Sequence, residues 1–109
     1  MNRRQVFYSP AARTDLTNIL RWIASAGAPQ SGLLYVERIE RFVDRLDLAS
    51  ECGRPREDVR PGMRVAAFER RVMVAYRVDD VSVTILRIFY GGQNWERAMS
   101  EEPEKDDDV

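Results

Sequence analysis

The residues of this sequence best suited to bind charged or polar groups are arginines, and many of them lie between Cys52 and Val78. This segment also contains two prolines and two glycines, and it continues directly into apolar residues. Guanidinium groups form bidentate hydrogen bonds with carboxylates and phosphates. The cluster is therefore consistent with three uses: a nucleic-acid surface, a catalytic site that holds phosphate, or a surface that docks on another protein.

The charge of the chain is distributed unevenly. The formal net charge is −1, but residues 100–109 hold six acidic residues and one lysine. Subtracting these from the 17 basic and 18 acidic residues of the whole chain leaves 16 and 12 in residues 1–99, a net charge of +4. All 16 bases are arginine. Residues 1–99 are too weakly basic to favour direct DNA binding.

The sequence lacks several of the usual chemical groups. It has no histidine, the commonest general base and metal ligand, and Cys52 is its only cysteine. We therefore expect no disulfide framework, no metal site and no cofactor. No apolar run approaches the ~18 residues of a membrane span, and the N-terminus lacks an apolar signal core. These features predict a cytoplasmic protein without a membrane segment.

The first half of the chain predicts a strand followed by two helices. The segment RQVFYSP alternates apolar and polar residues and indicates a short strand that Pro10 ends. Ser9 suits a helix N-cap and Pro10 the first helical position, and helical spacing of apolar residues continues to Gly27. A second helix begins at Pro29. The short AGAP link predicts that the two helices form an antiparallel hairpin.

The second half predicts a loop and three strands. The segment ECGRPREDVRPG shows no regular spacing of apolar residues and is expected to be a loop. The strands that follow are Met63–Phe68, Val72–Val78 and Val81–Tyr90. The turn at Glu69 and Arg70 is unusual because it contains neither glycine nor asparagine. Near its end the last strand is apolar on both faces, which predicts a central position in the sheet, and the segment GGQNWERAM predicts a short helical turn after it.

The order of elements is strand, helix, helix, strand, strand, strand, which predicts an α+β fold. The helix hairpin must bury its apolar stripes on one face of an antiparallel meander, and the first strand is expected to join an edge of that sheet. We expect one domain at residues 1–99 and an acidic, disordered tail at residues 100–109.

The motifs of the second half resemble the ParE branch of the RelE/ParE superfamily of bacterial toxins, and the similarity runs from about Val6 to Trp95. The residues that carry it are G-R-x-R (Gly53, Arg54, Arg56), P-G-x-R (Pro61, Gly62, Arg64), Y-R-V-D-D (Tyr76–Asp80), and I-L-R-I followed by one residue and Tyr90-Gly91. The resemblance implies the toxin of a type II toxin–antitoxin system.

One branch of this superfamily resembles ribosome-dependent nucleases that cut messenger RNA. Such cleavage needs a base, an acid and a cationic group for the phosphorane charge. Met73 stands where those nucleases have an arginine, and the residues after the last strand are uncharged. Tyr90 is a possible proton donor, and Arg54, Arg56 and Arg64 are possible phosphate ligands. This set is incomplete, so RNA cleavage is the alternative interpretation.

The ParE branch implies a different mechanism, in which the toxin binds DNA gyrase and traps its cleaved DNA complex. This needs a recognition surface and no catalytic residues, so we do not expect an enzyme. The segment FYGGQN departs from the family pattern, in which many members have a histidine and a charged residue. The candidates for binding the target are Arg54, Arg56, Arg64, Arg87, Tyr90 and Trp95.

The resemblance also implies an antitoxin of the ParD type, with a DNA-binding ribbon–helix–helix region and a C-terminal segment that folds on the toxin. We expect a hetero-oligomer with this antitoxin, docked on the helix hairpin. The candidate contact residues lie outside the apolar stripes that the two helices are expected to bury in the core: Trp22, Ala26, Leu33, Leu34 and Val36. A third possibility is an antitoxin-binding module without toxicity.

Arg87 requires acceptors because it lies in the middle of the apolar run ILRIF. Two interpretations remain open from the sequence. Either Arg87 is a buried structural arginine that bonds loop carbonyls or an acid such as Asp58, or it faces a partner.

Overall fold

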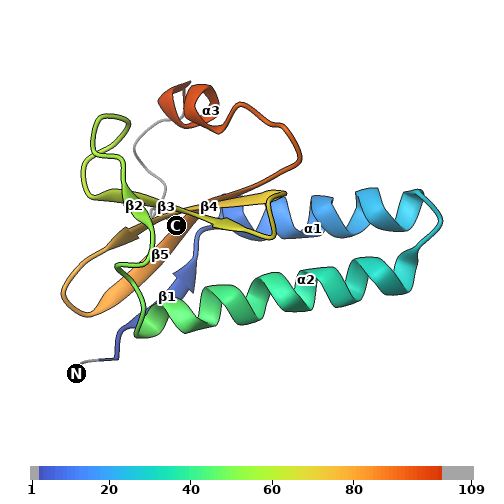
Figure 1. Ribbon diagram of the computed structural model, residues 1–109, viewed down its shortest axis with the longest axis horizontal. Coiled ribbons are helices and arrows are strands. Elements are labelled where there is room, and N and C mark those ends of the chain that lie inside the picture. Colours follow the sequence, from blue (N-terminus) through green and yellow to red (C-terminus); the bar gives the residue numbers. More distant parts are fainter. Residues whose placement is uncertain (1–2, 102–109) are drawn as a thin grey trace.

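Two long helices lie side by side along one face of a five-stranded sheet in the computed structural model, which describes residues 3–101 (Figure 1). The third helix lies on the other side of the sheet. The elements in chain order are β1 (Gln5–Tyr8), α1 (Pro10–Ser25), α2 (Pro29–Asp44), a 3₁₀ turn η1 (Arg45–Asp47), β2 (Arg54–Pro55), β3 (Met63–Phe68), β4 (Val72–Val78), β5 (Ser82–Tyr90) and α3 (Trp95–Glu101). The predicted α+β class and the order of its main elements are confirmed.

The strand order in the sheet is β1-β5-β4-β3-β2. Strands β3, β4 and β5 form the predicted antiparallel meander, and β1 adds to its edge in parallel with β5. The central position predicted for the last strand is also confirmed, since β5 lies between β1 and β4.

The segment predicted to be a loop contains one more strand. In β2, Arg54 pairs with Val65 and Pro55 with Arg64 of β3. The prediction was wrong here because two residues, one of them proline, are too few to produce a period of two.

Ser9 joins the start of α1 to the sheet. Its Oγ accepts a hydrogen bond from the Ala12 N–H at 3.0 Å and donates one to the Leu86 carbonyl at 2.8 Å. Its own N–H donates to the Ile85 carbonyl at 2.9 Å. The predicted N-cap is therefore confirmed, and it also fixes where α1 begins relative to β5.

The helix hairpin closes tightly near its tip. Gly27 follows α1 with a φ of 91°, a left-handed conformation that favours glycine at helix ends. Gly32 is buried against α1, and a Cβ on it would lie 3.3 Å from the Cβ of Ile23. A glycine at this position therefore lets α1 and α2 approach closely.

The sheet is covered on both faces, and each face has its own core. The hairpin side buries large residues such as Ile19, Ile39 and Tyr76. The opposite side buries a smaller cluster: Met63, Val65, Ala75, Leu86, Phe89 and Met99. Met99 comes from α3 and is only 1% exposed. The short helical turn predicted here is thus a helix that covers the second face.

The helix α3 continues through Glu101, so the predicted domain boundary at residue 99 falls within it. The Arg60 Nη2 donates to the Met99 carbonyl at 3.1 Å, which holds α3 against the loop before β3. The predicted acidic tail from residue 102 onward lies outside the described residues.

The turn between β3 and β4 is strained. Glu69 and Arg70 have φ angles of 51° and 67°, which non-glycine residues rarely adopt. The Glu69 carboxylate accepts two hydrogen bonds from the Arg38 guanidinium, at 3.0 and 2.9 Å. The turn predicted at Glu69 and Arg70 is confirmed and also includes Arg71. An ion pair ties it to α2.

Candidate functional site

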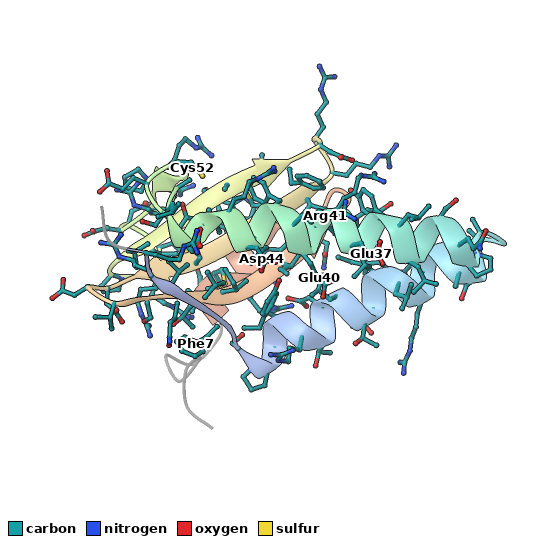
Figure 2. All side chains as sticks on the ribbon, turned by 90° about the horizontal axis from the view of Figure 1, so that it is seen from below. Phe7, Glu37, Glu40, Arg41, Asp44 and Cys52 are labelled. Atoms are coloured by element: carbon teal, nitrogen blue, oxygen red, sulfur yellow. The ribbon has the colours of Figure 1, made fainter. Side chains whose placement is uncertain are left out.

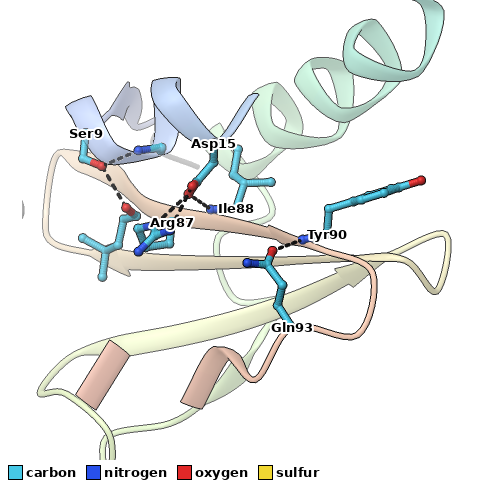
Figure 3. Close-up of polar contacts among 8 residues, drawn as sticks. Ser9, Asp15, Arg87, Ile88, Tyr90 and Gln93 are labelled. Atoms are coloured by element: carbon cyan, nitrogen blue, oxygen red, sulfur yellow. Dashed lines mark hydrogen bonds and ion pairs between the residues drawn. The ribbon is translucent and has the colours of Figure 1, made fainter. Parts of the chain in front are cut away.

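The structure separates the predicted target-binding residues, and Arg87 belongs to an internal ion pair. Its Nε and Nη2 lie 2.7 and 2.9 Å from the two carboxylate oxygens of Asp15 on α1 (Figure 3). Asp15 is 8% exposed, and its Oδ2 also accepts a hydrogen bond from the Ile88 N–H at 2.8 Å. Strand β1 pairs with β5 only as far as Ile85. Asp15 therefore supplies an acceptor where the neighbouring strand has ended.

Asp58, which the sequence suggested as a partner of Arg87, binds a different arginine. Its carboxylate pairs with Arg56, whose Nη2 lies 2.8 Å from Asp58 Oδ2 and 2.7 Å from Glu96 Oε2. The Arg56 Cζ also lies 5.0 Å from the centre of the Trp95 ring. The two carboxylates raise the pKa of Arg56. Arg56 and Trp95 are thus brought together, in a contact that holds α3 in place.

Arg64 and Tyr76 fix the loop that precedes β2. The Arg64 Nη1 donates to the Gly53 carbonyl at 2.6 Å and to the Glu51 carbonyl at 3.3 Å. The Tyr76 hydroxyl accepts from the Gly53 N–H at 2.9 Å and donates to the Ser50 carbonyl at 2.8 Å. Burial raises the pKa of Tyr76 to about 12, so the hydroxyl remains a neutral donor. The sequence motifs around Gly53 and Tyr76 therefore serve as internal braces.

Arg54 and Tyr90 lie in separate places. Arg54 is exposed, has no side-chain partner among residues 3–101, and lines a shallow pocket of about 430 Å³ with Cys52 and Met73. The centre of the Tyr90 ring lies 6.0 Å from that of the Trp22 ring and 5.8 Å from that of the Tyr35 ring. Arg54 is thus available to a partner on the β2 edge, whereas Tyr90 belongs to the hairpin side.

The atypical residues after β5 shape a chain reversal. The Gln93 Oε1 accepts from the Tyr90 N–H at 2.9 Å (Figure 3), and the Asn94 Oδ1 accepts from the Arg97 N–H at 3.1 Å. The GGQN segment therefore uses its amide side chains to turn the chain from β5 into α3.

A pocket of about 440 Å³ lies beside the helix hairpin; we call it the hairpin pocket. Its lining residues are Ile23, Ser31, Leu34, Tyr35, Arg38, Arg71 and Tyr90. The sequence alone did not single out Tyr35, Arg38 or Arg71. The unusual turn before Arg71 was the signal in the sequence that pointed to this place.

The predicted antitoxin-binding residues are mostly on the surface. Trp22, Leu33 and Leu34 are 51%, 55% and 59% exposed, and Ala26 is exposed as well. Leu34 lines the hairpin pocket, and Trp22 lies beside Tyr90 at its edge. Val36 is half-buried and lines a different groove of about 340 Å³ with Leu20 and Glu40. We call this second groove the outer groove.

The described part of the chain shows neither a cluster of metal ligands nor a membrane span. Within residues 3–101, no group of three or more His, Cys, Asp or Glu side chains is placed to share a metal ion. In the same range no helix is both long enough and apolar enough to cross a membrane. What the described surface offers instead is exposed apolar side chains and guanidinium groups, which are the residues that dock proteins.

The comparison that decides the family covers most of the folded chain. A family model described as "ParE toxin of type II toxin-antitoxin system, parDE" matches residues 6–95. The chain belongs to the ParE toxin family. It is 32% identical over 80 residues to Toxin ParE3 of Caulobacter vibrioides, a match that covers 73% of this chain and 79% of that protein.

A solved structure supports the same ParE fold. The chain resembles one from the chromosomal ParDE TA system of P. aeruginosa, with a TM-score of 0.71 and 26% sequence identity. The match covers 82% of this chain and 97% of the other. The resemblance to ParE toxins stated from the sequence is therefore confirmed, and the protein is a toxin of a type II toxin–antitoxin system.

Proposed function

We propose that this ParE toxin acts in the cytoplasm by binding DNA gyrase and stabilising its cleaved DNA complex. The observation that carries the proposal is the match to the ParE toxin family across residues 6–95. Exposed Arg54 on the β2 edge is the strongest candidate for contact with gyrase, since it has no side-chain partner among the described residues. Arg64 supports this edge from within, through its hydrogen bonds to the Gly53 and Glu51 carbonyls.

The internal bonding of the arginines and tyrosines supports binding over RNA cleavage. Arg56 and Arg87 are neutralised by carboxylates, and Arg64 is bonded to backbone carbonyls. Tyr90, the candidate proton donor, lies on the hairpin side beside Trp22 and Tyr35, in a different place from the candidate phosphate ligand Arg54.

We also propose that a ParD-type antitoxin neutralises the toxin by laying an apolar segment on the helix hairpin. The exposed side chains of Trp22, Leu33 and Leu34 support this docking surface. Large apolar side chains at helix surfaces are typical anchors for an amphipathic helix.

Expression without the antitoxin tests the mechanism. We expect filamentous cells with a DNA-damage response, and accumulation of cleaved DNA when the purified toxin is mixed with gyrase and DNA. Arg54→Ala should weaken this gyrase inhibition about tenfold, the loss typical of an interface anchor. Arg21→Ala removes another exposed arginine, from α1, and should leave gyrase inhibition unchanged. Rapid arrest of translation with cut messages would instead support the RelE-type nuclease, and the absence of toxicity would support a binding module.

A further inference from the structure

The hairpin pocket combines apolar walls with an available positive charge. Ile23, Leu34 and Tyr90 form apolar parts of its wall. Arg71 lines the pocket, is exposed, and has no side-chain partner within residues 3–101. Arg38 also lines the pocket, but Glu69 already binds its guanidinium. The pocket therefore offers one free guanidinium next to an apolar surface.

Tyr35 lines the same pocket and carries a buried polar group without a partner among residues 3–101. Tyr35 is 9% exposed, and its hydroxyl is buried with no hydrogen bond among the described residues. Burial raises the pKa of Tyr35, so the hydroxyl stays protonated and is a donor that lacks an acceptor. An unsatisfied buried hydroxyl destabilises the free protein, and such groups in native structures call for an explanation.

The strained turn before Arg71 points to the same place. Glu69 and Arg70 both have positive φ, although neither is glycine or asparagine. Backbone strain of this kind costs about 1–3 kcal/mol per residue and often accompanies binding sites. Here the turn positions Arg71 at the pocket and brings Glu69 to Arg38.

The outer groove holds charges of both signs, because Arg13 and Glu40 both line it. Glu37, Glu40 and Asp44 follow one another along α2 (Figure 2), and Glu40 lines the outer groove itself. A carboxylate of a partner would be repelled there. The hairpin pocket is therefore the better match for an acidic group, since none of its lining residues is acidic.

We propose that the hairpin pocket receives an acidic side chain of the antitoxin together with a neighbouring large apolar one. The carboxylate pairs with Arg71, while the apolar side chain packs on Leu34 and Tyr90. The Tyr35 hydroxyl is buried in the free toxin. It donates to the carboxylate after neighbouring side chains move aside on binding. One guanidinium and one hydroxyl match the single charge and the acceptor capacity of a carboxylate. This inference rests on the proposed neutralisation by an antitoxin.

The first test compares two adjacent arginines. The affinity of the full-length toxin for the ParD-type antitoxin of its own operon is measured by calorimetry at low and at high salt. We expect Arg71→Gln to weaken binding at least tenfold and to reduce its dependence on salt. Arg70→Gln changes the neighbouring exposed arginine, which does not line the pocket, and should bind like the wild type.

The second test compares the two unpartnered tyrosine hydroxyls. Tyr35→Phe should keep or raise the melting temperature of the free toxin, because it removes an unsatisfied buried hydroxyl, yet it should weaken antitoxin binding severalfold. Tyr8→Phe removes the other buried tyrosine hydroxyl that has no partner among residues 3–101, and Tyr8 does not line the pocket. It should have a similar effect on melting and none on binding.

The outcomes separate this inference from the proposed function. If the antitoxin binds the wild type and Arg71→Gln behaves like Arg70→Gln, the pocket assignment is overturned while neutralisation stands. If the antitoxin does not bind the wild type, both are overturned. A charge exchange tests the pairing directly. The Arg71→Glu toxin should bind poorly to the wild-type antitoxin. If replacing one acidic residue of the antitoxin with arginine restores binding, that residue is the partner of Arg71.

Discussion

Replacing Asp15 with alanine is expected to lower the free energy of unfolding by about 3–5 kcal/mol, the usual loss when one member of a buried ion pair is removed. Asp15 lies 2.7 Å from the Arg87 Nε and accepts from the Ile88 N–H at 2.8 Å. The substitution removes the carboxylate that neutralises the largely buried Arg87 guanidinium and accepts from the buried Ile88 N–H. Since a small domain has about 5–15 kcal/mol of stability in total, denaturant unfolding followed by circular dichroism will detect the loss.

Three further variants identify the cause of this loss. Asp15→Asn keeps an acceptor for the Ile88 N–H and should lose less than Asp15→Ala. Adding Arg87→Met to Asp15→Ala should recover part of the stability, because the unpaired charge is gone. Glu69→Gln breaks the bidentate ion pair with Arg38, which is exposed. Its effect on the free energy of unfolding should be much smaller than that of Asp15→Ala. A loss from Asp15→Ala as small as that from Glu69→Gln would contradict a structural role for the buried pair.

The sequence predicted that Arg87 needs an acceptor but not which residue supplies it. The two partners are 72 residues apart in the chain. Their contact depends on where β1 ends and where Ser9 starts α1, and no local pattern encodes that geometry. Asp58 was the acid considered for Arg87, and in the structure it binds Arg56 instead.

Helices and strands long enough to repeat their apolar spacing were predictable from the sequence, and shorter elements were not. The two helices and the meander strands repeat their apolar spacing over many residues, and their predicted ends agree closely with the structure. Strand β2 has only two residues, so its pairing with β3 follows from tertiary structure. The packing of α3 could not be predicted for a similar reason. Met99 packs in a cluster whose other buried members come from the strands, so the contact depends on the folded sheet.

The candidate site was predictable in composition but not in arrangement. The sequence identified the arginines but could not distinguish those with acceptors, such as Arg56 and Arg64, from exposed Arg54. That difference depends on carboxylates and carbonyls from remote segments. The hairpin pocket was missed for the same reason, since the sheet must place Arg71 beside α2.

Replacing Gly53 with alanine is expected to lower the free energy of unfolding by about 2–4 kcal/mol, from overpacking and a weakened buried hydrogen bond. A Cβ at this position would lie 2.5 Å from the Tyr76 hydroxyl and 2.7 Å from the Val65 carbonyl oxygen. Neither atom can move freely, because the hydroxyl makes two hydrogen bonds and the carbonyl belongs to β3. Chemical denaturation of the purified toxin measures the loss.

Gly92→Ala is the matched control for Gly53→Ala. A Cβ on Gly92 would meet no atom within 4 Å, so its stability should stay close to that of the wild type. Adding Tyr76→Phe to Gly53→Ala removes the closer of the two clashes, and the combined loss should be smaller than the sum of the single losses. Gly53 also precedes Arg54, so a displaced loop should reduce gyrase inhibition as well as stability. Equal stability of Gly53→Ala and Gly92→Ala would show that the loop can relax around the added methyl group, and Gly53 would then not fix the position of Arg54.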